Sequence, residues 1–116
     1  MECAFCRITA DKYLAENEHF FAIKDINPFT PGHCLIISKR HARDFFELES
    51  AEMEALREIS LELKALLDKE YGPDGYNLLM NCGRAASQSV FHFHLHFLPR
   101  HNRDGKFFGL LRRFIH

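Results

Sequence analysis

The chain has 116 residues, of which 47% are hydrophobic and 27% are charged, and its formal net charge is −1. This length supports a single domain over residues 1–116, and the near-neutral charge argues against nonspecific binding to nucleic acid, which needs a basic surface. No apolar run reaches the roughly 18 residues of a membrane span, and residues 1–3 carry an acid instead of an apolar signal segment, so we expect a cytoplasmic protein whose four cysteines stay reduced.

Short elements fill the first third of the chain. Residues 3–10 predict a helical turn, and aromatic and aliphatic residues predict strands at 13–15 and 20–24. Residues 27–32 are rich in turn formers. The aliphatic stretch 33–38 that follows them predicts a third, central strand.

A long helix is predicted next. Ser50 is the expected N-cap, with Glu52 and Glu54 in the first turn, where negative charge suits the helix dipole. Apolar residues then recur at helical spacing, at Met53, Leu56, Ile59, Leu63, Leu66 and Leu67. The Gly-Pro pair at 72–73 ends the helix. The stripe predicts a face that is buried in the core or in a dimer interface.

Residues 91–98, with the sequence Phe-His-Phe-His-Leu-His-Phe-Leu, carry the most informative pattern of the chain. Alternation with a period of two is typical of a half-buried strand. The histidines then share one face and four large apolar residues share the other, whose burial would hold the imidazoles in place. The histidines are His92, His94 and His96, and the apolar residues are Phe91, Phe93, Leu95 and Phe97. Three imidazoles on one rigid face can bind a metal, attack phosphorus or relay protons.

The remaining strand completes the predicted fold. Residues 76–81 predict a fourth strand, and the short loop 82–87 after it favours pairing with the histidine strand, which brings Asn81 near the histidines. One long helix and five short strands, joined mostly by tight turns, predict an α+β fold with a five-stranded antiparallel meander.

The segment at 92–98 resembles the signature of the histidine triad family, in which histidines alternate with hydrophobic residues. The similarity continues in order through Asp25-Ile26, Gly32-His33, Lys39-Arg40-His41, Asn81, Gly83 and Gln88-Ser89-Val90, so it covers most of the chain. The resemblance implies a homodimer whose sheets join across the interface. It also implies a purine nucleotide site on each subunit, with chemistry at the α-phosphorus.

Catalytic roles for three residues are implied by the same resemblance. His94 corresponds to a nucleophile that forms a nucleotidyl-histidine, which water then hydrolyses. Neutral imidazole suits this role because its ordinary pKa is about 6.5. His96 corresponds to a donor to the phosphate or leaving group, and Ser89 to a hydroxyl near the scissile bond. A plain surface hydroxyl is the structural alternative for Ser89.

The resemblance also implies residues that bind the nucleotide. Asp25 corresponds to the acid that contacts the ribose hydroxyls, Asn81 to a phosphate donor and His33 to a histidine beside the nucleophile. The implied set further contains Gln88 and an apolar clamp around the base, formed by Phe5, Ile8, Ile23 and Ile26. Structural alternatives stay open, since Asp25 could start the turn at 27–28, Asn81 could end a strand and the clamp could be core.

One position departs from the family pattern. Ser87 stands where family members often carry a glycine whose backbone amide faces the phosphate. A side chain at this point predicts a narrower pocket or a changed leaving-group preference.

Cys3 and Cys6 form a Cys-x-x-Cys pair, which can hold one side of a tetrahedral zinc. A redox pair or two buried thiols are the alternatives, although a thioredoxin-like motif would follow a strand and no strand is predicted before Cys3. The resemblance supplies His41 and His92 as the two further ligands of a structural zinc.

These observations together favour a zinc-containing hydrolase that cleaves purine nucleoside phosphoramidates or related adenylylated compounds. A dinucleoside polyphosphate hydrolase and a nucleotide-binding regulatory module with incidental catalysis are the alternatives. A catalytic metal held by all three histidines is a further possibility, against which Asn81, the Gln-Ser pair at 88–89 and the Cys-x-x-Cys pair argue.

Overall fold

The computed structural model describes residues 3–114. The expectation about a signal segment used residues 1 and 2, which lie outside the described residues. The elements of the structure are η1 (Ala4–Arg7), η2 (Ala10–Lys12), β1 (Ala15–Glu16), β2 (Phe20–Lys24), β3 (Cys34–Ser38), η3 (Phe45–Glu47), α1 (Ser50–Tyr71), β4 (Gly75–Leu79), η4 (Arg84–Ala86), β5 (His94–Arg100) and α2 (Phe107–Phe114), where η marks a 3₁₀ turn. The predicted α+β class is confirmed.

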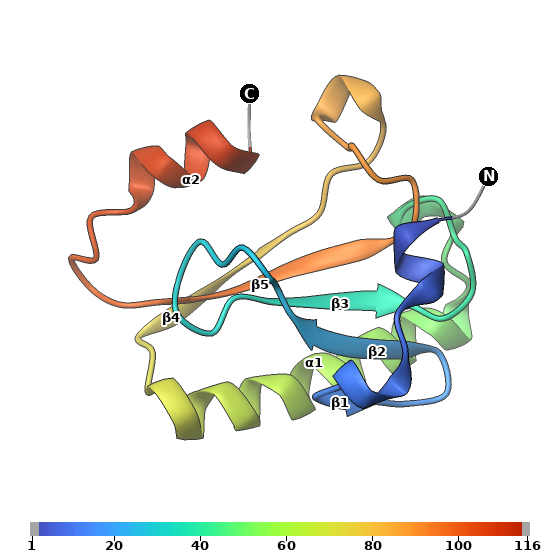
Figure 1. The fold of residues 1–116 in the computed structure, drawn as a ribbon, viewed down its shortest axis with the longest axis horizontal. Coiled ribbons are helices and arrows are strands. Elements are labelled where there is room, and N and C mark those ends of the chain that lie inside the picture. The colour runs from blue at the N-terminus through green and yellow to red at the C-terminus, as the bar shows by residue number, and fades with distance from the viewer. Residues whose placement is uncertain (1–2, 115–116) are drawn as a thin grey trace.

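The strands form one antiparallel sheet in the order β1-β2-β3-β5-β4. The predicted pairing of the histidine strand with β4 is confirmed, but the sheet is not a simple meander, because β5 lies between β3 and β4 (Figure 1). After β3 the chain runs through α1 and returns as an edge strand, which leaves the central place for β5. The histidine strand is therefore hydrogen-bonded on both sides and held rigidly.

Several element boundaries differ from the prediction, among them the start of the histidine strand, which begins at His94 and not at residue 91. Two further differences have clear local reasons. The N-cap of α1 is Glu49 and not Ser50, because the Glu52 side chain accepts the backbone N–H of Glu49 at 2.9 Å and starts the helix there. Strand β1 begins two residues after Tyr13, whose backbone N–H closes the turn η2 and whose ring stacks on Phe21.

The main core lies between α1 and one face of the sheet (Figure 1). It includes the helix residues Leu56, Ile59, Leu63 and Leu67 and the β5 residues Leu95 and Phe97, with Phe93 just before them. The apolar back of the histidine strand is thus confirmed except at Phe91, which precedes β5 and lies under two arginines instead. Met53 and Leu66, which belong to the predicted helix stripe, are exposed.

Helix α2 was not predicted and lies on the face of the sheet opposite α1 (Figure 1). Leu110 and Phe114 pack there against Leu98 of β5. Within residues 3–114, neither helix combines the length and apolar character that crossing a bilayer requires.

Candidate active site

A pocket of about 820 Å³ opens on the sheet face that carries the histidines. The antiparallel register places Leu35 opposite His96 and Ile37 opposite His94, so these four side chains share that face. The pocket is lined by these histidines and by all five residues predicted to surround the base and ribose, which are Phe5, Ile8, Ile23, Asp25 and Ile26. Its size and apolar wall suit a nucleoside.

The protonation of His94 is fixed by its backbone neighbour. Its Nδ1 lies 2.8 Å from the carbonyl oxygen of His92, and a carbonyl only accepts, so Nδ1 carries the proton. Burial lowers the pKa of His94, which outweighs the opposing effects of this hydrogen bond and of Asp25. The neutral ring therefore presents the Nε2 lone pair, the form that a nucleophile needs.

His33 and His96 form a hydrogen-bonded pair beside this nucleophile. The Phe29 backbone donates to Nδ1 of buried His33 at 3.0 Å, so the His33 proton is on Nε2, which lies 3.0 Å from Nδ1 of His96 and 3.3 Å from the Asp25 carboxylate. Burial lowers the pKa of His33 to about 4 and that of His96 to about 3. The His33–Asp25 contact is thus not an ion pair, because the ring is neutral, and Nε2 of His96 keeps a proton that it can donate.

Asp25 forms the turn that was its structural alternative, while its contact with a ribose stays a prediction. One carboxylate oxygen accepts the backbone N–H of Asn27 at 2.9 Å and forms the turn, while the other lies against His33. The same side chain lines the pocket. The turn therefore fixes the carboxylate at the wall of the pocket.

The loop between β4 and β5 is held together by Gln88 and Asn81. The buried Gln88 amide accepts from the Gly83 backbone at 2.7 Å and donates to the Arg43 carbonyl at 2.7 Å, so its side chain organises the loop. The Asn81 amide donates to the carbonyls of Ser87 at 3.4 Å and Phe114 at 3.3 Å. Neither side chain lines the pocket, so contact of either with a nucleotide stays a prediction.

Ser87 and Ser89 differ in conformation and exposure. Ser87 has φ of 71°, the left-handed region that favours glycine, which explains why a glycine is common at this position in the family pattern. Ser89 is exposed on the same loop, two residues further along the chain. Its role near a scissile bond stays a prediction.

Cys3, Cys6, His41 and His92 form a second cluster, with their ligand atoms all within 4.8 Å of one another. Nδ1 of His92 lies 3.3 Å and 3.4 Å from the two sulfurs and 3.1 Å from Nδ1 of His41. The opposite nitrogen, Nε2, donates to the Ser38 carbonyl at 2.7 Å, which leaves Nδ1 as a free lone pair for a metal. The sequence-based ligand set is thus brought together in space.

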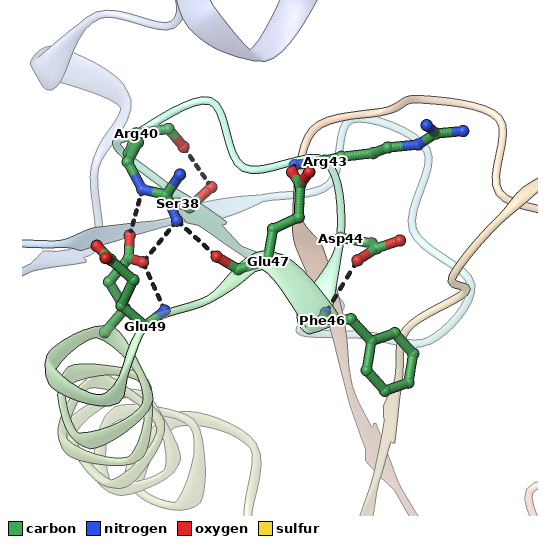
Figure 2. A network of polar contacts seen from close by, with 8 residues as sticks. Ser38, Arg40, Arg43, Asp44, Phe46, Glu47 and Glu49 are labelled. Atoms are coloured by element: carbon green, nitrogen blue, oxygen red, sulfur yellow. Dashed lines mark hydrogen bonds and ion pairs between the residues drawn. The ribbon is translucent and has the colours of Figure 1, made fainter.

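Figure 2 shows a polar network at the start of α1, and Ser38 of this network contacts His92 of the cluster. Ser38, whose carbonyl binds His92, donates its hydroxyl to the Arg40 carbonyl at 2.7 Å. The Arg40 guanidinium donates to the Glu47 carbonyl at 2.7 Å and to both carboxylate oxygens of Glu52, at 3.1 and 2.8 Å. The segment that carries His41 is therefore fastened to the helix.

Two features near the histidines were missed from the sequence. The Phe114 ring packs on His96 at a centroid distance of 4.7 Å, and the nearby Arg113 helps to lower the pKa of His33 and His96. Phe114 and Arg113 could not be found from the sequence, because no pattern in the last residues predicted α2. The second feature is the pair Arg43 and Arg84, which contact the ring of Phe91. No regular spacing of residues in the sequence indicates this contact.

Comparison with known proteins, by sequence and by structure, gives matches that agree with one another. A sequence model of the HIT domain matches residues 8–103. The adenosine 5′-monophosphoramidase of Schizosaccharomyces pombe is 39% identical over 108 residues, which cover 90% of this chain and 78% of that protein. The crystal structure of a HIT family protein from Bacillus anthracis has a TM-score of 0.78 at 37% identity, covering 87% of this chain and 74% of its own. A zinc-bound histidine triad family protein from Mycobacterium smegmatis has a TM-score of 0.78 at 36% identity, covering 88% and 77%.

Proposed function

This chain belongs to the HIT family, and we propose that it hydrolyses purine nucleoside phosphoramidates or related adenylylated compounds at the α-phosphorus. The single observation that carries the proposal is the tautomer of His94, a residue that lines the nucleoside-sized pocket and keeps a lone pair on Nε2. The similarity to a yeast enzyme named for phosphoramidate hydrolysis supports the same reaction.

The reaction has two displacement steps. In the first, Nε2 of His94 attacks the α-phosphorus, a phosphorus–nitrogen bond to the histidine forms, and the bond to the leaving amine breaks as the amine takes up a proton. In the second, water attacks the same phosphorus, the bond to His94 breaks, and one proton passes to solvent. Neutral imidazole is both a good nucleophile and an adequate leaving group, so one hard displacement becomes two easier ones.

Neighbouring side chains stabilise charge and move protons. Nε2–H of His96 donates to a phosphoryl oxygen, and the hydrogen bond from His33 to Nδ1 holds this tautomer. The hydroxyl of Ser89 gives a proton to the leaving amine and regains one from water. Asp25 receives the ribose hydroxyls at the pocket wall.

We also propose that zinc binds between the two thiols and two imidazoles of the Cys3, Cys6, His41 and His92 cluster. Two sulfurs and two nitrogens form a common donor set for structural zinc, and the Ser38 carbonyl supplies the usual partner of a ligating histidine. The zinc-bound Mycobacterium smegmatis relative supports this assignment. Four protein ligands leave no open position, so the metal would anchor the N-terminal segment and the start of β5 without entering the reaction.

We further propose that two chains pair as a homodimer. Strand β4 is an edge of the sheet, where a second chain can pair. Leu78 in this strand is 50% exposed, and Met80, just after the strand, is 38% exposed. Sedimentation equilibrium of the wild type should give twice the mass of one chain. A monomeric mass at micromolar concentration would contradict this part of the proposal.

The function is tested by measuring AMP release from adenosine 5′-phosphoramidate, with diadenosine triphosphate as the alternative substrate. The phosphoramidate should be cleaved faster, and His94→Ala should lower turnover by about 10³-fold or more while AMP binding measured by calorimetry persists. Faster cleavage of the dinucleotide would favour a dinucleoside polyphosphate hydrolase. AMP binding without turnover of either substrate would favour a regulatory module.

A further inference from the structure

Arg43 and Arg84 converge on one aromatic ring outside the pocket. The Cζ atoms of their guanidinium groups lie 5.1 Å and 5.9 Å from the ring centroid of Phe91. Both arginines are exposed, and among residues 3–114 no ion pair joins either of them to an acid. The Glu47 carboxylate accepts the backbone N–H of Arg43 and so leaves the guanidinium available. Two positive charges that form no ion pair among residues 3–114 therefore lie at one place on a nearly neutral chain.

The placement of these charges is built into the fold. The buried Gln88 side chain bonds to the carbonyl of Arg43 on one side and to the amide of Gly83, the neighbour of Arg84, on the other. One amide therefore fixes the two backbone segments from which the arginines extend. Phe91 offers its ring to both guanidinium groups, a contact that lowers the cost of holding like charges together.

The arginines come from segments that do not line the pocket and that pack on Phe91, shortly before His94 in the chain. The pocket is bounded by the N-terminal segment, β2, Leu35 and the two histidines, and no residue of the loop 83–91 lines it. Phe91 is three residues before His94, a separation of at most roughly 10 Å in extended chain. A nucleotide with its base in the pocket and its phosphorus at His94 would direct the leaving group toward the loop that carries Ser89 and the arginines.

We propose that Arg43 and Arg84 bind a negative charge on the leaving group, so that the preferred substrates are adenylylated compounds whose leaving amine carries a carboxylate. This inference rests on the proposed function and specifies its substrate class. The charges act within a Debye length of about 8 Å at physiological salt, so they attract an anionic group beyond the scissile bond as the substrate binds.

Two substrates that differ in a single charge test the proposal. The first is the N-propyl phosphoramidate of AMP, and the second is the N-(2-carboxyethyl) phosphoramidate, whose leaving amine is similar but carries a carboxylate. The variants are Arg43→Gln, Arg84→Gln and the double substitution. Arg57→Gln is the matched control, because Arg57 is exposed on α1 on the opposite side of the sheet and its loss changes the net charge by the same amount.

The wild type should cleave the carboxyethyl compound with a kcat/KM about tenfold higher than the propyl compound, and the double variant should lose most of that preference. Each single variant should lose part of it, the control should keep it, and 0.5 M salt should reduce it in the wild type. Equal kcat/KM values for the two substrates in the wild type, or a preference that survives the double substitution, would overturn the proposal while leaving the proposed function intact. Absence of cleavage of both substrates by the wild type would refute the proposed function itself.

Discussion

Replacing Glu52 by glutamine tests whether the polar network in Figure 2 stabilises the fold. The Glu52 carboxylate accepts three hydrogen bonds, two from Arg40 at 3.1 and 2.8 Å and one from the Glu49 backbone at 2.9 Å, and the residue is only 3% exposed. Glutamine keeps the shape, but it removes the charge and replaces one acceptor oxygen with a donor that faces a donor.

The size of the effect follows from the exposure of the two partners. A hydrogen bond to a charged group contributes about 1.5 to 3 kcal/mol, and a fully buried pair that loses one partner costs more. The Arg40 side chain is 47% exposed, so water can take over part of its hydrogen bonding in the variant. We therefore expect Glu52→Gln to lower the free energy of unfolding by about 2 kcal/mol.

Urea unfolding at pH 7 measures this loss, and Glu62→Gln on the exposed side of α1 is the control, with an expected change of less than about 0.5 kcal/mol. Hydrogen bonding from Arg40 holds the pKa of Glu52 below its ordinary value of 4.5. The stabilisation is therefore complete above pH 4.5 and lost as the pH falls through the lowered pKa, so the two proteins should converge in acid. A loss at pH 7 no larger than that of the control would refute the reasoning.

Three further predictions concern the site. Ser89→Ala should lower kcat by about 10²-fold for alkylamine leaving groups and by less for 4-nitrophenol, with AMP affinity unchanged, and equal losses for both would contradict proton donation by Ser89. Replacing Cys3 and Cys6 by serine should remove one zinc per chain in elemental analysis and lower Tm more than the rate of the chemical step, whereas retained zinc would place the metal elsewhere. Burial holds the pKa of His33 and of His96 below the ordinary 6.5, so the unfolded chain binds protons more readily than the folded one. The free energy of unfolding from urea titrations should therefore fall by about 2 kcal/mol for each histidine between pH 6.5 and 4.5. A flat profile would show that these rings are not buried as neutral groups.

Periodic patterns predicted the elements that bury a continuous face. The alternation around His94 and the helical spacing around Leu63 are direct records of which side chains face the core. The order of the strands in the sheet could not be predicted in this way, because the period of two in β5 is the same whether its neighbour is β3 or β4. Helix α2 escaped prediction because eight residues hold too few turns for a repeat to stand out.

The candidate site, like the fold, could be predicted only in part. Its histidines and the Cys-x-x-Cys pair were found because several chemically unusual residues stand at regular spacing, and the family resemblance supplied the distant partners His33 and His41. The protonation of His94 could not be predicted, since it depends on where the carbonyl of His92 points as β5 begins. The contact of Gln88 with the substrate stays a prediction, whereas its hydrogen bonds to Gly83 and Arg43 hold the loop, and sequence spacing does not distinguish these roles.

The most direct test of the central claim is whether the nucleotide becomes bonded to His94 during turnover. Wild-type protein mixed with adenosine 5′-phosphoramidate and quenched without acid should gain the mass of one adenylyl group, and fragmentation should locate it on the peptide that contains His94. The His94→Ala variant should gain no mass under the same conditions. An adduct on another residue, or AMP release at a wild-type rate by the alanine variant, would contradict the account.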